Sequence, residues 1–342
     1  MRVPLWIAAS ALGALLLLGA IAFALLGRDA SPDDTPPGNP AVRATPLPAA
    51  AATPVPTPKE TPVPSLPALD AYSGLGSWVD IYDDEAWRNP SRAVSDMASH
   101  GVRTLFIETA NSRAPSAIKD PVALRTFMSE AHARDMRVVA WYLPSLKSEA
   151  KDFSRIAEAI AFRTADGRGF DSFALDIESS AVRPESERNT RLAALSAKIR
   201  ALVGPSYPLG AIIPSPVGLA KKAGYWDDFP YAEVAQAYDI LVPMGYYTYH
   251  GDGARSAYED TRANVRILRA QKGCVDKPIH LIGGLAEKSS AAEVEAFVRA
   301  ARETGCFGAS LYGWVGTSDG HWRALQSVET RPAARVPAPG GD

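Results

Sequence analysis

Two acidic residues, Asp176 and Glu178, stand two positions apart at the end of an apolar stretch that reads FDSFALDIE over residues 170–178. Side chains alternate between the two faces of a β-strand, so these acids share one face with the small residues Ser172 and Ala174. The opposite face carries the bulky residues Phe173, Leu175 and Ile177. Two neighbouring carboxyl groups push their pKa values apart, and one of them can then stay protonated and act as an acid. The pattern therefore predicts acid chemistry at the end of a strand.

The rest of the chain predicts the scaffold that holds these acids. Eight apolar runs recur along it, and they cover residues 76–82, 101–108, 136–143, 170–178, 207–214, 238–247, 277–284 and 307–314. Amphipathic segments separate them, for example residues 122–135, 185–204 and 289–305, the last with a serine cap near Glu293. This alternation indicates a parallel sheet, and eight strand–helix units in roughly 250 residues predict an α/β fold, a single (β/α)8 TIM barrel. An open doubly wound sheet is the alternative, disfavoured because no glycine-rich turn follows the first run. Pro243 in the sixth run cannot donate to a sheet ladder, which leaves the extent of that strand open.

Acids and aromatic residues gather where the predicted strands end, which is the edge that carries the active site in a (β/α)8 barrel. They are Asp80 and Asp83, Glu108 and Asn111, Trp141 and Tyr142, Asp176 and Glu178, Met244, Tyr246, Tyr247, Tyr249 and His250, Glu287, Tyr312 and Trp314. Aromatic rings pack against the C–H faces of sugars, and a carboxylic acid can protonate a glycosidic oxygen. We therefore expect a carbohydrate ligand at this rim.

The sequence D-S-F-A-L-D-I-E at residues 171–178 resembles the D-x-x-D-x-D-x-E signature of glycoside hydrolase family 18, the chitinase family. Members of that family have a (β/α)8 barrel with the signature on the fourth strand. The resemblance implies that Glu178 is the general acid and that Asp176 orients and stabilises the N-acetyl group of the substrate. Hydrolysis in that family is assisted by the substrate and uses no protein nucleophile.

Two further places resemble the same family, and the likeness covers about residues 72–328. Residues 244–246, M-G-Y, are similar to its M-x-Y motif, which implies that Tyr246 bonds the reacting acetamido group. Trp314 is similar in position to the tryptophan that forms the floor of the cleavage subsite after strand eight.

The chain departs from the family pattern at three places. Ala174 replaces the middle aspartate of the signature, Tyr247 replaces the aspartate that usually follows the M-x-Y tyrosine, and A-W-Y-L at residues 140–143 replaces S-x-G-G. Glu178 and Asp176, with Asp80 on the first strand, also resemble the family 25 muramidases, which cut peptidoglycan. A non-catalytic glycan-binding barrel is a third interpretation.

The strand-end positions and the family resemblance together define a predicted site. The predicted catalytic residues are Glu178, Asp176 and Tyr246, and the predicted substrate contacts are Trp314, Asp80, Glu108, Trp141 and Tyr247. The expected partner is a polysaccharide or a peptidoglycan-type glycan. A formal net charge of −2 offers no basic surplus for nucleic acid. We expect no cofactor, and two cysteines with five scattered histidines argue against a metal site.

Segments outside the barrel predict where the protein works. Residues 1–28 hold an uncharged run long enough to cross a bilayer, which we interpret as a signal anchor, with a cleaved signal peptide as the alternative. Residues 29–70 form a linker rich in proline, alanine and threonine, residues 71–329 the barrel, and residues 330–342 a disordered tail. We expect a single-pass membrane protein with its barrel outside the cytoplasm, or a secreted protein if the segment is cleaved. In that oxidising compartment Cys274 and Cys306, each just before a predicted strand, are expected to form a disulfide.

Overall fold

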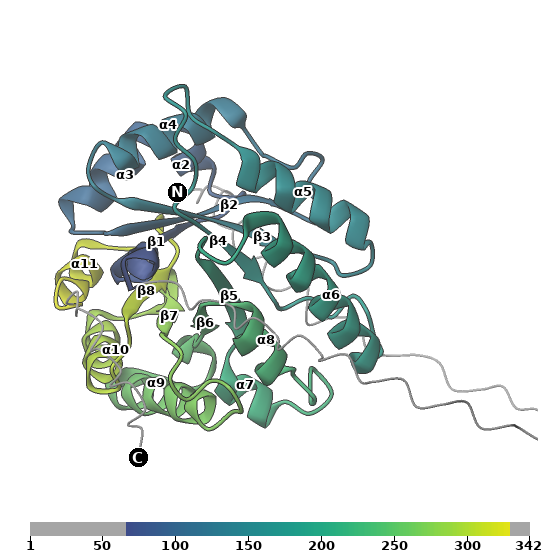
Figure 1. Ribbon diagram of the computed structural model, residues 1–342. Helices are drawn as coiled ribbons and strands as arrows, with labels where there is room; N and C mark the ends of the chain where they lie inside the picture. The colour runs from purple at the N-terminus through teal and green to yellow at the C-terminus, as the bar shows by residue number, and fades with distance from the viewer. Residues whose placement is uncertain (1–65, 329–342) are drawn as a thin grey trace, which may run out of the picture. The chain divides into compact units, whose positions relative to one another are not determined.

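The computed structural model describes residues 66–328, and within them eight parallel strands close into a barrel (Figure 1). The strands are β1 (Gly74–Val79), β2 (Thr104–Asn111), β3 (Arg137–Leu143), β4 (Ser172–Asp176), β5 (Leu209–Pro214), β6 (Ile240–Met244), β7 (His280–Leu285) and β8 (Gly308–Tyr312). Each strand pairs with the next along the chain, and β1 pairs with β8 to close the ring. The predicted (β/α)8 barrel is confirmed.

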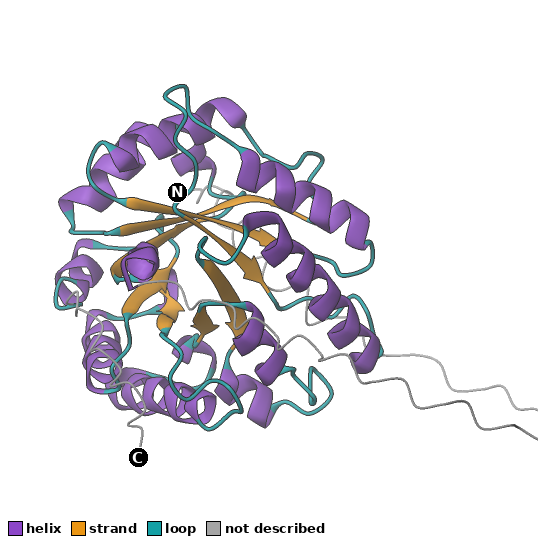
Figure 2. Cartoon of the chain, viewed as in Figure 1, coloured by secondary structure: helices purple, strands orange, loops and turns teal. Residues whose placement is uncertain are grey.

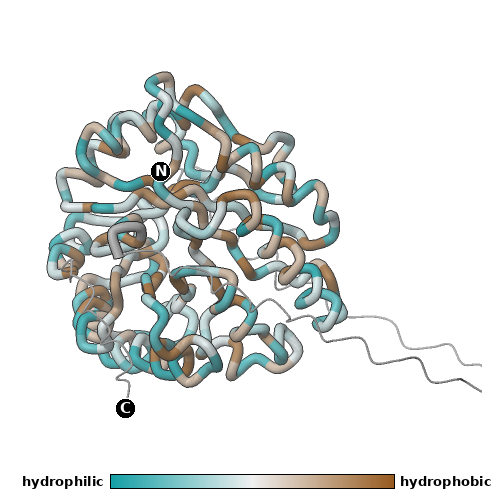
Figure 3. The backbone as a smooth tube through the Cα atoms, viewed as in Figure 1, coloured by the Kyte–Doolittle hydropathy of each residue, from teal (hydrophilic) through white to brown (hydrophobic). Residues whose placement is uncertain are grey.

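Helices surround this ring of strands, as Figure 2 shows in purple. They are α2 (Asp84–Arg88), α3 (Pro90–Ser99), α4 (Pro121–His132), α5 (Glu149–Ala161), α6 (Glu185–Val203), α7 (Pro216–Lys221), α8 (Tyr231–Ala237), α9 (Gly253–Arg269), α10 (Ala291–Glu303) and α11 (Asp319–Leu325). Hydrophobic and hydrophilic residues are interleaved along them (Figure 3), as expected for helices with one face against a barrel. The predicted serine cap is Ser290, whose side chain and that of Glu293 form a capping box at the start of α10.

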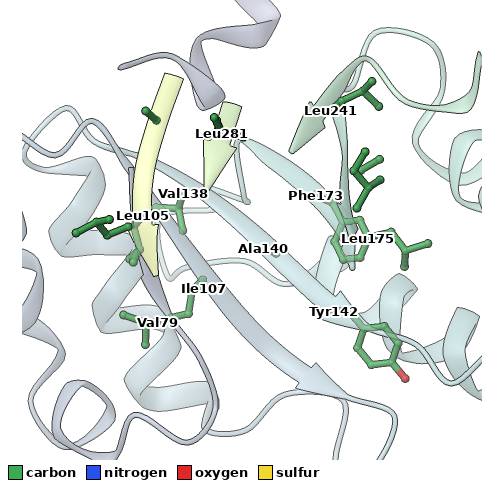
Figure 4. Packing of buried hydrophobic residues seen from close by; sticks show 14 of the residues in the cluster. Val79, Leu105, Ile107, Val138, Ala140, Tyr142, Phe173, Leu175, Leu241 and Leu281 are labelled. Atoms are coloured by element: carbon green, nitrogen blue, oxygen red, sulfur yellow. The ribbon is translucent and has the colours of Figure 1, made fainter. Parts of the chain in front are cut away.

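Alternation along the strands divides the core into two layers. Outward-facing side chains pack against the helices, and Figure 4 shows several of them, including Ile107, Ala140 and Phe173. Inward-facing side chains fill the barrel and form a separate cluster that includes Trp78 and Phe106, whose rings stack with centroids 4.2 Å apart. Burying one such large apolar side chain stabilises the fold by about 1.5–3 kcal/mol. The barrel is therefore a packed core, and a ligand must bind at its end.

A short 3-10 helix, η1 (Leu66–Tyr72), covers the end of the barrel where the strands begin. Leu69 and Tyr72 are buried with the interior cluster, and the Tyr72 hydroxyl lies 2.7 Å from the Ser172 hydroxyl at the start of β4. The predicted linker ran to residue 70, so it overlaps this element. The reason is that Leu69 packs against the interior of the barrel, which the proline-rich composition before it obscures.

Pro243 lies inside β6, opposite Ile213 of β5. On its other side β6 pairs with β7 only at Met244 and through an isolated bridge from Leu241 to Ile279. Proline lacks an N–H, so it is tolerated here because the ladder toward β7 is sparse.

Several expectations fall outside the described residues. The predicted anchor at residues 1–28, most of the linker and the tail at residues 330–342 all lie there. Between residues 66 and 328 no helix combines the length and the apolar character needed to cross a membrane.

Candidate active site

Asp176 and Glu178 lie at the end of the barrel where the strands terminate. Ser172, Ala174 and Asp176 point inward along β4, while Phe173 and Leu175 belong to the layer beneath the helices. The predicted division of faces is confirmed along the strand. Asp176 is its last residue and is only 6% exposed, and Glu178 follows two positions later and is partly exposed.

Burial raises the pKa of both β4 acids. The pKa of Asp176 is held well above its usual range first by burial and then by the negative charges of Glu178 and Glu108. The pKa of Glu178 is also raised, and burial is the cause. Among the described residues neither acid forms an ion pair with a Lys, Arg or His. Both groups are therefore biased toward the protonated form that a general acid requires.

A second pair of acids approaches from β1 and β2. Glu108 is only 2% exposed, and its Oε2 accepts a hydrogen bond of 3.0 Å from the backbone N–H of Ile81. Burial, reinforced by the charges of Asp80 and Glu178, raises the pKa of Glu108 to about 8. Asp80 follows β1 and is partly exposed. The structure thus brings the predicted residues Asp80, Glu108, Asp176 and Glu178 together.

Two tyrosines lie beside these acids. Tyr312 ends β8 and donates a hydrogen bond of 2.9 Å from its hydroxyl to Oδ2 of Asp80. Tyr246 follows β6, and its ring meets that of Tyr312 edge to face with centroids 6.0 Å apart. Burial and the neighbouring carboxylates, including Glu178 and Asp176 for Tyr246, raise the pKa of both phenols. Both therefore keep their protons and can donate hydrogen bonds.

Trp141 projects inward from β3 and is 4% exposed. Its ring meets Trp78 edge to face with centroids 5.9 Å apart. In the sheet register Trp141 lies opposite Ala174, and both belong to the interior cluster. A longer side chain at position 174 would compete with the indole for this space. Two departures from the family pattern are thus neighbours in the structure.

Two predicted sugar contacts do not reach this site. Tyr247 is 1% exposed, its hydroxyl donates to Oγ of Ser289 at 2.9 Å, and its ring packs near Phe297 in the layer outside the barrel. The backbone of Tyr246 is left-handed, with φ of 41°, and this turn sends the next side chain outward. The structure therefore places Tyr247 in the outer layer, away from the acids.

Trp314 is also turned away from the barrel interior. Its indole N–H donates to Oδ2 of Asp96 in α3 at 2.8 Å, and it is 7% exposed among the outer core residues. Strand β8 ends at Tyr312, so strand alternation no longer governs residue 314. The structure therefore places Trp314 in the outer layer, and the aromatic residue of β8 that lies beside the acids is Tyr312.

Tyrosines that the predicted site omitted lie around the acids. Tyr312 shares the inward parity of Gly308 and Ser310 on β8, which is the signal that would have selected it. Tyr225 donates a hydrogen bond of 2.6 Å to the backbone oxygen of Glu178. It lies in the loop between α7 and α8, where no periodicity marks it.

The predicted disulfide is wrong, because Cys274 and Cys306 are both free. Cys274 lies in the turn after α9, with its Sγ 3.9 Å from the backbone oxygen of Tyr231 at the start of α8. The Sγ of Cys306 instead contacts the Thr304 hydroxyl at 3.7 Å. Neighbouring strands did not bring the cysteines together because Cys274 precedes β7 by several residues and packs under a different helix.

Comparison with solved structures finds proteins that share the fold of this barrel. Neither the family models nor the curated proteins include a match. An endo-β-1,4-mannanase from Thermotoga petrophila has a TM-score of 0.58 at 10% identity, with 75% of this chain and 76% of that chain covered. A class V chitinase from Pseudomonas fluorescens Pf-5 has a TM-score of 0.55 at 11% identity, with 75% and 99% covered. A GH18 chitinase from Cycas revoluta, solved with (GlcNAc)3, has a TM-score of 0.53 at 11% identity, again with 75% and 99% covered.

These similarities show the fold. The chain shares its (β/α)8 barrel with these glycoside hydrolases, GH18 chitinases among them, at only 10–11% sequence identity. The site residues above come from this chain's own geometry.

Proposed function

We propose that this protein is a glycoside hydrolase that acts on a glycan containing N-acetylhexosamine. One observation carries the proposal: Asp176 and Glu178 stand together at the end of β4, and the pKa of each is raised. They lie in the barrel mouth, by which we mean the end of the barrel where the strands terminate. A close pair of acids without a cationic partner, of which one is buried, is costly to the fold unless it has a role. The neighbouring tyrosines and the glycoside hydrolases that share the fold support the same class of reaction.

Glu178 would act as the general acid. Its raised pKa keeps a proton available at a pH where an ordinary glutamate has lost it, and that proton would pass to the glycosidic oxygen of the leaving sugar. Asp176 would accept the N–H of the substrate's acetamido group, and the Tyr246 hydroxyl would donate to its carbonyl oxygen. The acetamido oxygen would then attack the anomeric carbon, so no protein nucleophile is needed. Tyr312, fixed by its bond to Asp80, would pack beneath the sugar ring.

The substitution Glu178→Gln tests this assignment. Glutamine keeps the shape but holds no transferable proton, so release of reducing ends from N-acetylglucosamine oligomers should fall by about a hundredfold to ten-thousandfold. Binding of the same oligomers should remain. Glu158→Gln on the exposed face of α5 is the matched control and should leave turnover unchanged. Equal turnover in Glu178→Gln and the wild type would remove Glu178 from the mechanism.

Peptidoglycan is a second substrate to test because it also contains N-acetylhexosamines and because Asp80 on the β1 side reaches the same mouth. Hydrolysis of peptidoglycan without hydrolysis of chitin oligomers would favour the muramidase alternative. Binding of either glycan without turnover would favour a non-catalytic barrel.

We also propose that residues 1–28 anchor the protein in the membrane and that the proline-rich linker holds the barrel outside the cytoplasm. The support is the length of the uncharged run and the composition of the linker. Membrane fractionation, followed by protease treatment of intact cells, tests both parts. A soluble cytoplasmic protein would contradict them.

A further inference from the structure

Two buried polar atoms in the barrel mouth have no hydrogen-bond partner among residues 66–328. Between residues 66 and 328 such atoms occur on four side chains, Thr104, His132, Trp141 and Asp176. Thr104 begins β2 and His132 ends α4, so both lie toward the opposite end of the strands. The other two are Nε1 of Trp141 and Oδ1 of Asp176, and both residues are more than nine-tenths buried. An unpaired buried polar group is destabilising, so we expect each of these atoms to form a hydrogen bond with a bound molecule.

The two atoms come from neighbouring positions on adjacent strands. Trp141 of β3 is paired in register with Ala174 of β4, and Asp176 lies two residues further along β4. Both side chains face the barrel interior. Strands lie about 4.8 Å apart and rise about 3.3 Å per residue, which puts the two Cα atoms roughly 8 Å apart. The two side chains therefore enter the same part of the barrel end where the strands terminate.

The chemistry of the pair is complementary to a secondary amide. The indole Nε1 can only donate a hydrogen bond, and the carbonyl oxygen of a carboxyl group accepts one whether that group is ionised or protonated. A secondary amide offers the reverse pattern, with a carbonyl that accepts and an N–H that donates, on opposite sides of a planar group. Its carbonyl oxygen has two lone pairs, so it can accept from Trp141 and from the hydroxyl of Tyr246 together.

We infer that Trp141 completes an amide clamp with Asp176: its Nε1 donates to the carbonyl of the same acetamido group whose N–H the proposed function assigns to Asp176. The inference rests on the proposed function and extends it by making Trp141 a residue that determines specificity for N-acetylated sugars. Ala174 is part of the same arrangement, since its small side chain leaves the indole its place beside β4.

Trp141→Phe tests the clamp by removing the N–H and keeping an aromatic ring beside Trp78. The measurement is the affinity of the full-length protein for N-acetylglucosamine tetramers, glucosamine tetramers and cellotetraose, by calorimetry, with kcat/KM wherever turnover occurs. We expect the wild type to prefer the N-acetylated tetramer over both others. In the variant, affinity for the N-acetylated tetramer should fall about tenfold, with little change for cellotetraose.

Trp226→Phe is the matched control. Trp226 is also buried, but it lies in the outer layer, where its Nε1 donates to Oδ1 of Asn189 in α6 at 2.7 Å. This variant should lower stability, because it breaks a satisfied hydrogen bond, and should leave ligand preference unchanged. Comparison of the two variants separates a loss of binding from a general loss of structure.

Each outcome decides a different claim. If the wild type hydrolyses N-acetylated tetramers and Trp141→Phe keeps the same preference, the clamp is refuted and the proposed function stands. If the wild type hydrolyses none of the glycans but its binding preference is lost in Trp141→Phe, the clamp stands and the hydrolase is refuted. If the wild type binds cellotetraose as tightly as the N-acetylated tetramer, a hydroxyl or a solvent molecule satisfies the two atoms, and the clamp is refuted.

Discussion

Glu108 should make the stability of this protein fall as pH rises, and Glu108→Gln should abolish that part of the pH dependence. Burial raises the pKa of Glu108 from an ordinary 4.5 to about 8 in the folded state. Between these two values the folded state holds a proton on Glu108 that the unfolded state has released. Stability from this group is therefore fully present below the unfolded pKa and is lost as pH rises through the folded pKa.

The size of the effect follows from linkage. One such group lowers the free energy of unfolding by about 1.4 kcal/mol per pH unit, or at most about 4 kcal/mol between pH 5 and pH 8. Glutamine carries no charge at any of these pH values, and its side-chain oxygen can still accept the bond from the Ile81 N–H. The variant should thus match the wild type near pH 5 and be the more stable protein by a few kcal/mol at pH 8.

Urea unfolding of the full chain at pH 5, 6, 7 and 8 measures this difference. Asp176 and Glu178 also have raised pKa values, so both proteins lose stability with pH and only the difference between them reports on Glu108. Glu158→Gln, on an exposed surface, should follow the wild-type curve. Parallel curves for Glu108→Gln and the wild type would show that Glu108 titrates near its ordinary pKa, and the electrostatic description of the site would then be wrong.

Two further predictions concern the scaffold. A methyl group added at Gly210 would meet the hydroxyl of Tyr72, so Gly210→Ala should lower the free energy of unfolding in urea by about 1–3 kcal/mol. Gly320→Ala, where the added methyl group makes ordinary contacts, should not lower it. Equal stability of the two variants would contradict the tight packing of Tyr72 against the start of the strands. Protein that is denatured without reductant should show two thiols per chain in a titration with a thiol reagent. The folded protein should react slowly with the same reagent, because burial raises the pKa of Cys274 and of Cys306 to about 11. Loss of both thiols when the native protein is oxidised in air would instead support the predicted disulfide.

The sequence predicted the barrel and the β4 acids well because one physical constraint fixes both. A strand between a packed interior and a layer of helices must place its bulky residues on one face, so the positions of Phe173 and Leu175 determine where Asp176 points. Ser290 and Glu293 were predictable for a similar reason, since a capping box is a local interaction between near neighbours.

The errors arose where the chain leaves a strand. Tyr247 follows a left-handed residue and Trp314 follows the end of β8, so strand alternation fails at both positions. Tyr225 reaches Glu178 from a loop between two helices, and this contact depends on the tertiary fold alone. Cys274 was misassigned because proximity of two strands says nothing about a residue in the turn before one of them.

The structure of Glu178→Gln with a bound N-acetylglucosamine oligomer tests the central claim most directly. The substitution should preserve binding and stop turnover, so that the intact substrate remains in the mouth of the barrel. We predict that an acetamido group lies within hydrogen-bond distance of Asp176 and Tyr246, with a sugar ring over Tyr312 and the glycosidic oxygen next to residue 178. An oligomer bound on the helices, or at the end of the barrel covered by η1, would contradict this site.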